Sequence, residues 1–194
     1  MTAPNQRCVL VRHGETEWSL DGRHTGRTDL PLLPEGEAQS RALRPSLAAF
    51  TFATVLASPL RRARETAALA GLGGQAVTDP DLAEWDYGAY EGLTTAQIRK
   101  ERPGWDLFTD GVPGGESAHD VAVRADRVIA RIRSVPGDVA CVAHSHVLRV
   151  LAARWIGLDP AVGQNLVIDP AALGELGWDR EHPVLHSWNR RHRD

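Results

Sequence analysis

The sequence predicts an α/β fold, a three-layer α/β/α sandwich with a mostly parallel central sheet. Three observations lead to this prediction. Short apolar runs recur along the chain and are continuous rather than alternating, which is typical of parallel strands buried on both faces. Segments with helical spacing of apolar residues separate these runs. Near the carboxyl terminus, short apolar segments follow one another between turn residues, as antiparallel strands do.

Three continuous apolar runs, residues 7–11, 53–57 and 138–143, are the predicted parallel strands. A polar cluster directly follows each of them, at residues 12–15, 58–62 and 144–146. In open α/β sheets, ligands bind beyond the carboxyl ends of the strands. We therefore expect the three polar clusters to meet in one functional site.

Apolar residues at helical spacing predict four helices between or after these strands: residues 35–50, 60–70, 118–133 and 147–156. Pro45 must kink or interrupt the first of them, because proline lacks a backbone N–H. Ser117 is suited to cap the start of the third helix.

Two further regions complete the predicted architecture. Residues 165–168, 173–178 and 184–188 are predicted strands, added in antiparallel order at the edge of the sheet. Residues 79–113 combine tryptophan, tyrosine, glycine and acidic residues, and we expect them to form a functional insertion over the strand ends. Packing in the core or in a lid is favoured for its aromatic side chains over stacking on a substrate.

The composition favours a single domain spanning residues 1–194 that acts on a small partner. The 194 residues are 42% hydrophobic and 24% charged, which suits one globular core. A net charge of -3 argues against nucleic acid and against a membrane surface as partners. No apolar run approaches the ~20 residues of a spanning helix, and the first five residues do not resemble a secretory signal. These features predict a cytoplasmic location, and a homodimer is compatible with them.

The strand-end clusters contain two arginines and two histidines that suit phosphoryl chemistry: Arg12, His13, Arg62 and His144. Two guanidinium groups can hold the oxygens of a phosphate while an imidazole attacks phosphorus in line. The positive charges also disfavour a protonated imidazole, so the attacking group stays neutral near neutral pH. These clusters predict a phosphoryl-binding site with nucleophilic catalysis.

Cleavage of a phosphate ester also requires a proton for the leaving oxygen. A carboxylic acid near the phosphate can donate it and, once ionised, can accept a proton from attacking water. Glu84 is the predicted donor, and Glu15 and Glu91 are the alternatives. The chain shows neither a glycine-rich nucleotide loop nor a cluster with metal-ligand spacing, so we expect no cofactor and no metal.

Four segments resemble the motifs of a known family. Leu10-Val11-Arg12-His13-Gly14-Glu15-Thr16-Glu17-Trp18 resembles the signature of the histidine phosphatase (phosphoglycerate mutase-like) superfamily, and residues 58–66, 84–94 and 143–146 match further motifs in the family's order. The similarity covers roughly residues 7–155. It implies a phosphoglycerate mutase-like fold and a phosphohistidine intermediate on His13. It also implies a phosphate clamp formed by Arg12, Arg62 and His144, with Glu84 as the proton donor.

The resemblance extends to the expected substrate-binding residues. Ser19 and Thr25 occupy positions that help hold the phosphate in relatives, by hydroxyl or amide contacts. His24 and Arg27 either bind a second phosphate or anchor their loop. Ser145 and His146 complete the set. Mutases of the family commonly have glycine at the position of His146, which predicts a polar contact with substrate there.

Departures from the family's mutases favour a phosphatase. Those mutases usually have asparagine at the position of Ser19 and a basic insertion after the acid residue, whereas the region after Glu84 is short and acidic here. Residues 22–32 and 110–117 are similar to the acid phosphatase and sedoheptulose-bisphosphatase-like branch. The resemblance thus implies a metal-independent histidine acid phosphatase that hydrolyses the phosphomonoester of a small metabolite, with a sugar phosphate as the favoured substrate class. A phosphoglycerate mutase, a phosphoryl-transfer isomerase, is the alternative.

Overall fold

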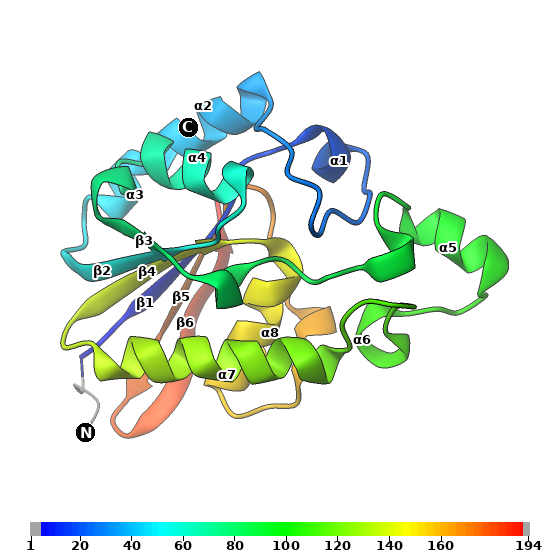
Figure 1. Ribbon diagram of the computed structural model, residues 1–194. Helices are drawn as coiled ribbons and strands as arrows, with labels where there is room; N and C mark the ends of the chain where they lie inside the picture. Colours follow the sequence, from blue (N-terminus) through cyan, green and yellow to red (C-terminus); the bar gives the residue numbers. More distant parts are fainter. Residues whose placement is uncertain (1–4, 192–194) are drawn as a thin grey trace.

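A computed structural model describes residues 5–191 and shows a six-stranded mixed sheet (Figure 1). Residues 1–4 and 192–194, and with them the predicted domain ends and most of the segment examined for a secretory signal, lie outside the described residues. The strands are β1 (Cys8–Arg12), β2 (Phe52–Ala57), β3 (Ala76–Thr78), β4 (Asp138–Ala143), β5 (Leu173–Asp179) and β6 (His182–Arg190). Their order in the sheet is β3-β2-β4-β1-β5-β6. Neighbours among the first four pair in parallel, while β5 and β6 add in antiparallel order, as predicted.

Helices cover both faces of this sheet, which confirms the predicted three layers. In Figure 1, α2 (Pro34–Ala42), α3 (Arg44–Leu47) and α4 (Arg61–Leu69) lie above it, and α7 (Ala118–Ser134) and α8 (Ser145–Trp155) lie below. Shorter helices occupy the loops: α1 (Glu17–Leu20), α5 (Thr95–Glu101) and α6 (Leu107–Asp110). Single turns of 3-10 helix form at Gly73–Gln75, Pro80–Leu82 and Gly88–Tyr90, and a longer one at Pro160–Asn165.

The central strands are continuous apolar runs because they contribute to two cores. Cys8 and Leu10 of β1 belong to the cluster packed against α7 and α8, whereas Val9 and Val11 belong to the cluster on the other face. Successive side chains of a strand point to opposite faces, so a strand covered on both faces needs apolar residues at every position. The strand-end polar clusters are therefore the first residues of these segments whose side chains are not part of the two apolar clusters.

One predicted strand is wrong, and one observed strand was not predicted. Residues 165–168 are not a strand: Asn165 ends a 3-10 helix, and the chain that follows is irregular although Ile168 is buried. The apolar run at 166–168 resembles a strand in the sequence, but only Ile168 is buried, and Val167 is 58% exposed. Strand β3 was not predicted, because it is three residues long and Val77 in it is 58% exposed. The predicted helix at 35–50 is interrupted at Leu43, consistent with the expected effect of Pro45.

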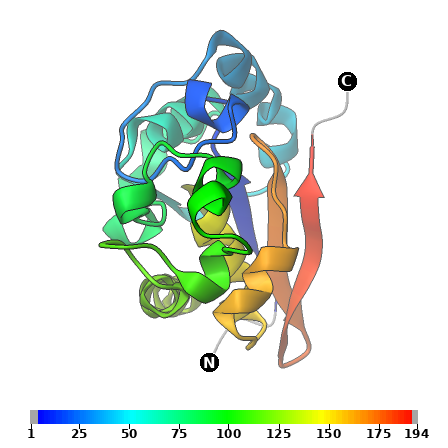
Figure 2. The same cartoon turned by 90° about the vertical axis from the view of Figure 1, so that its right-hand side faces the viewer.

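The insertion at residues 79–113 carries α5 and α6 and packs over one end of the molecule, which faces the viewer in Figure 2 (green). Its largest aromatic side chains are buried in the core cluster beside α7 and α8: Trp85, Tyr87, Trp105 and Phe108. Packing, as expected, explains their presence in an otherwise polar segment. None of the helices in residues 5–191 is both long and apolar enough to span a membrane.

Candidate active site

A cavity of about 230 Å³ opens beyond the carboxyl ends of β1 and β4. Most of the predicted site residues line it, together with residues that the sequence did not single out: Arg12, His13, Ser19, Gly22, Arg23, His24, Thr25, Glu84, Tyr87, Thr95, Ser145 and His146. Arg62 and His144 are fully buried and lie outside this lining, in contact with one another. Arg27 does not line the cavity.

His13 directly follows β1, and its backbone N–H donates to the Ala143 carbonyl at the end of β4. Its side-chain Nδ1 lies 2.7 Å from the Gly14 carbonyl oxygen. A carbonyl only accepts, so Nδ1 carries the proton and the lone pair is on Nε2. Burial, followed by the charges of Arg62 and Arg12, holds the pKa of His13 well below its usual range. His13 therefore presents a neutral imidazole with a free Nε2, as a nucleophile requires.

Arg62 is held in place by acceptors that carry no charge. Its Nε donates to Nδ1 of His144 at 3.1 Å, and its terminal nitrogens donate to the carbonyls of Thr25, Gly26 and Thr28. His144 in turn contacts the Ser58 hydroxyl through Nε2 at 2.7 Å. Because Nδ1 of His144 accepts, Nε2 carries its proton, and burial with the Arg62 charge lowers the pKa of this histidine well below its usual value. The ring centroids of His13 and His144 are 5.0 Å apart.

Arg12 also lacks a carboxylate partner in the described part of the chain. One terminal nitrogen donates to the Ile168 carbonyl at 2.6 Å, and its buried Nε has no hydrogen-bond partner there. Burial lowers the pKa of its guanidinium, an effect that the charge of Glu84 opposes. The guanidinium groups of Arg12 and Arg62 donate only to uncharged acceptors, so no carboxylate bonded to them neutralises their charge. The resulting positive potential at the cavity suits a phosphate dianion.

Glu84 is positioned by backbone amides at the start of α8. Its Oε1 accepts from the N–H groups of Trp85 and Val147, both at 2.9 Å, and its Oε2 accepts from His146 N–H at 3.0 Å. The residue is only 7% exposed, yet it lines the cavity. Oε2 keeps capacity for a further bond on the cavity side.

The two alternative acids do not line this cavity. Both carboxylate oxygens of Glu91 accept from the Gly26 amide, and one of them also accepts from the Thr28 amide, so Glu91 fixes the loop that Arg62 contacts. Glu15 borders a separate surface pocket beside α2. The geometry favours Glu84 as the proton donor.

The remaining wall is formed largely by an aromatic and imidazole cluster. The Tyr87 hydroxyl lies 2.6 Å from Nδ1 of His146, and the ring of His24 packs 4.8 Å from that of Tyr87, centroid to centroid. Burial lowers the pKa of His24 to about 4 and lowers the pKa of His146 well below its usual value. These histidines offer neutral hydrogen-bonding groups to a ligand, and Ser145 adds a hydroxyl-bearing side chain to the lining.

Three predicted binding residues have structural contacts of their own. The Ser19 hydroxyl belongs to the capping box that starts α1, where it donates to the Thr16 carbonyl. The Thr25 hydroxyl lies 3.1 Å from the Arg23 carbonyl. Arg27 forms an ion pair with Asp86 at 2.6 Å, and its side chain is 82% exposed. Of the two alternatives for Arg27, this arrangement favours an anchored loop and gives no support to a second phosphate site.

Some lining residues escaped the sequence analysis. Tyr87 was interpreted as a packing residue, and it is one, but its hydroxyl also borders the cavity through His146. Arg23 is an exposed residue of the segment 22–32, which the family resemblance included without singling it out, and Thr95 is a half-buried helix-start residue with no local pattern that points to it. Ser58 stands within a quoted motif, and its hydroxyl contact with His144 is a tertiary feature.

Comparison with known proteins identifies the family to which the chain belongs. Residues 8–191 match the model of the histidine phosphatase superfamily (branch 1). The chain belongs to this superfamily. It is a phosphatase of the superfamily, and its fold is that of phosphoglycerate mutase-like proteins. Membership implies a phosphorylated small molecule as substrate.

Individual relatives agree with the expected branch. The chain is 43% identical to an acid phosphatase of Mycobacterium tuberculosis over 188 residues, which cover 95% of this chain and 91% of that protein. It is 38% identical to a sedoheptulose 1,7-bisphosphatase of Saccharomyces cerevisiae, with 81% and 70% covered. A solved structure of a protein from M. tuberculosis superposes with a TM-score of 0.92 at 39% identity, covering 97% of this chain and 100% of that one.

Proposed function

We propose that this phosphatase hydrolyses phosphomonoesters of small metabolites, sugar phosphates above all, through a phosphohistidine intermediate on His13. The observation that carries the proposal is a neutral imidazole with a free Nε2 beside two guanidinium groups that end on neutral acceptors. Such a pocket attracts a phosphate dianion and presents it with an unprotonated nucleophile.

In the first half-reaction, the His13 Nε2 lone pair attacks phosphorus, and a P–N bond forms as the ester P–O bond breaks. Arg12 and Arg62 stabilise the charge that develops on the transferring oxygens. His144 holds the Arg62 guanidinium through Nδ1, and its own proton lies on the Ser58 side. Protonated Glu84 gives its proton to the leaving alkoxide, so the first product departs as a neutral alcohol.

In the second half-reaction, water attacks the phosphohistidine. Glu84, now a carboxylate, accepts a proton from that water, and the P–N bond breaks to release inorganic phosphate. His13 returns to its neutral form and Glu84 to its protonated form. No step requires a metal, and no group of three metal-ligating side chains was found within residues 5–191. Metal independence stays a prediction, and activity that survives exhaustive chelation would support it.

A second cavity beside the first supports the sugar phosphate assignment. It also measures about 230 Å³ and shares His24, Thr95 and His146 with the catalytic cavity. Its remaining lining is mixed polar and aromatic: Arg99, Trp105, Asp106, Leu107, Phe108, Arg149 and Gln164. Donors and acceptors in this wall suit a hydroxylated leaving group, while the aromatic residues suit the apolar face of a sugar. The similarity to a sedoheptulose bisphosphatase supports the same substrate class.

The decisive experiment traps the intermediate. Brief incubation with a labelled sugar phosphate, followed by denaturation, is expected to leave phosphate on His13 as an acid-labile and alkali-stable adduct. His13→Ala should abolish the label, whereas His119→Ala, at an exposed histidine of α7, should retain it. Label that persists in His13→Ala would exclude His13 as the nucleophile.

The alternative, a phosphoglycerate mutase, returns the phosphoryl group to substrate rather than to water. Assays of 3-phosphoglycerate with and without a bisphosphoglycerate primer separate the two, because a hydrolase releases inorganic phosphate in both. A single catalytic domain, a cytoplasmic location and a homodimer remain predictions from the sequence. Sedimentation of the purified protein tests the homodimer.

A further inference from the structure

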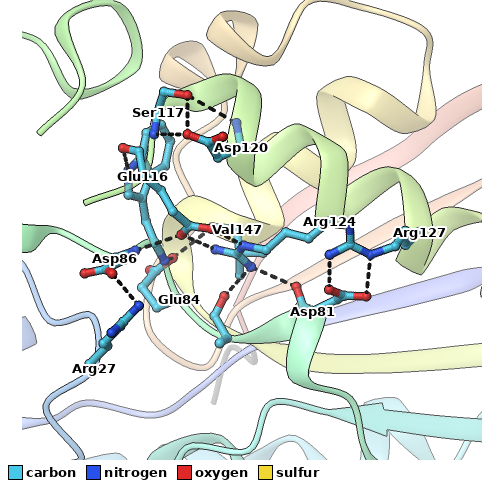
Figure 3. A network of polar contacts seen from close by, with 12 residues as sticks. Arg27, Asp81, Glu84, Asp86, Glu116, Ser117, Asp120, Arg124, Arg127 and Val147 are labelled. Atoms are coloured by element: carbon cyan, nitrogen blue, oxygen red, sulfur yellow. Dashed lines mark hydrogen bonds and ion pairs between the residues drawn. The ribbon is translucent and has the colours of Figure 1, made fainter. Parts of the chain in front are cut away.

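An ion pair outside the cavity joins helix α7 to the segment that carries Glu84. Arg124 and Glu116 bind each other through two bonds, with Nε to Oε1 at 2.8 Å and a terminal nitrogen to Oε2 at 3.0 Å (Figure 3). Their side chains are only 10% and 24% exposed. Neither residue lines the catalytic cavity.

Arg124 and Glu116 form hydrogen bonds with the chain on both sides of Glu84. On one side, Arg124 donates to the carbonyls of Asp81 and Ala83, at 2.8 and 2.6 Å. The Ala83 carbonyl belongs to the peptide group whose nitrogen is that of Glu84, so this contact fixes the plane from which Glu84 extends. On the other side, Oε2 of Glu116 accepts from the Asp86 amide at 2.9 Å, and its backbone carbonyl accepts from the Trp85 indole at 2.7 Å.

The segment from residue 79 to residue 86, here called the acid loop, has no strand to hold it. Apart from one 3-10 turn at Pro80–Leu82 it is irregular, and its backbone meets the sheet only where the Asp79 amide donates to the Ala57 carbonyl. The backbone bond from Glu116 to the Asp86 carbonyl joins the loop to the same pair. Beside Glu84, the backbone of this loop is held by side chains from residues 116 and 124, while the Glu84 carboxylate itself accepts from the amides of His146 and Val147.

We propose that Arg124 and Glu116 are positioning residues for the proton-donating carboxyl of Glu84. The proposal rests on the proposed function, in which Glu84 protonates the leaving oxygen. General acid catalysis requires the donor within hydrogen-bond reach of that oxygen, and a displacement of about 1 Å costs on the order of 10²-fold in rate. Loss of the ion pair removes hydrogen bonds to the residues on both sides of Glu84, while the nucleophile and the phosphate clamp remain in place.

The leaving group separates positioning from mere structural support. A sugar alkoxide leaves only with a proton, whereas p-nitrophenolate leaves without one. Arg124→Met is therefore expected to slow pre-steady-state release of the sugar by roughly 10–100-fold while release of p-nitrophenol changes by less than about threefold. Glu116→Gln should act in the same direction, because one carboxylate oxygen becomes an NH₂ group facing the donors of Arg124 and Asp86.

A matched control is available on the same helix. Arg127 forms an ion pair with the side chain of Asp81 at 2.5 Å and does not contact the backbone beside Glu84. Arg127→Met should leave the ratio of the two release rates unchanged. If Arg124→Met fails to fold, Glu116→Gln provides the test, since it keeps the size of the side chain.

A double-mutant cycle with Glu84→Gln decides whether the pair acts through Glu84. Without a proton donor to position, Arg124→Met or Glu116→Gln should add little further slowing, so the effects should be strongly non-additive. Equal slowing of both leaving groups, or full additivity with Glu84→Gln, would overturn the positioning role. If Glu84→Gln itself does not discriminate between the leaving groups, the assignment of the proton donor fails, and the proposal fails with it.

Discussion

The floor of the site, His13 with Arg12, Arg62 and His144, and the acid loop above it are held by different means. The floor follows the ends of β1 and β4 and the start of α4, and the register of parallel strands sets where His13 lies. The acid loop depends on side-chain bonds from the loop before α7 and from α7 itself, and Arg124 is 41 residues away from the Ala83 carbonyl that it holds. Backbone pairing in the sheet thus fixes the floor, whereas side-chain bonds hold the backbone of the acid loop.

The strongest test of this difference is removal of the nucleophile. His13→Ala should lower kcat by about 10⁴-fold or more, the scale seen when a covalent nucleophile is lost. Because the floor acts on the phosphoryl group, the loss should be similar for sugar phosphates and for p-nitrophenyl phosphate. Steady-state kinetics with both substrates measures it. A marked dependence on the leaving group would mean that the floor and the acid loop do not have separate roles.

Removal of the acid should behave differently. Glu84→Gln is expected to slow phosphorylation by sugar phosphates by roughly 10²–10⁴, the usual contribution of general acid catalysis, and to slow p-nitrophenyl phosphate much less. Rapid-quench measurement of the first product isolates this step from the later hydrolysis. Glu37→Gln serves as the control, since the exposed Glu37 carboxylate pairs with Arg41 on α2, away from the cavity. Equal slowing of both substrates would transfer the donor role to another residue.

Neighbouring arginines on α4 sharpen the assignment of the floor. Arg62→Ala should lose about 3 kcal/mol of transition-state stabilisation, or roughly a hundredfold in kcat/KM, because a donor aimed at developing charge is removed. Arg61 is exposed, pairs with Glu65 at 2.6 Å, and should tolerate the same change. Comparable damage from the two substitutions would show that the clamp has been misplaced.

A further expected effect concerns stability and pH rather than the rate of reaction. Burial lowers the pKa of His24 from 6.5 to about 4, so between these values the unfolded chain binds more protons than the folded one. The free energy of unfolding should therefore fall as the pH drops through this range, by up to about 3 kcal/mol from His24. Urea denaturation at successive pH values measures the slope, and His24→Phe should flatten it. A slope that His24→Phe leaves unchanged would assign the effect to the other buried histidines.

The sequence predicted that the side chains of the floor would meet at one edge of the sheet, because strand ends and helix starts are local features. The apolar runs stop at His13 and at His144, and Arg62 follows the run that forms β2, so three separate readings converged on one edge of the sheet. The partners of these residues could not be predicted in the same way. The carbonyls that accept from Arg62 belong to residues 25, 26 and 28. Every residue has a backbone carbonyl, so the sequence does not show which of them accept.

The same reasoning applies where the sequence was wrong or left two interpretations open. Residues 165–168 look like a strand because Leu166, Val167 and Ile168 form an apolar run, yet the Ile168 carbonyl accepts from Arg12 instead of from a neighbouring strand. For Arg27 the sequence left open a second phosphate contact and a loop anchor, and its ion pair with Asp86 favours the anchor. In each case a tertiary contact decided between interpretations that the local sequence left open.

Arg12 and Arg62 donate to uncharged acceptors, and this arrangement also affects turnover in a solution rich in phosphate. A site assembled in this way before substrate arrives does not distinguish the phosphoryl end of an ester from free orthophosphate, since both bring the same oxygens to Arg12 and Arg62. The released product is thus a competitor for the empty enzyme. We expect turnover to follow the ratio of ester to orthophosphate, with orthophosphate and other tetrahedral oxyanions acting as competitive inhibitors whose affinity falls in Arg62→Ala.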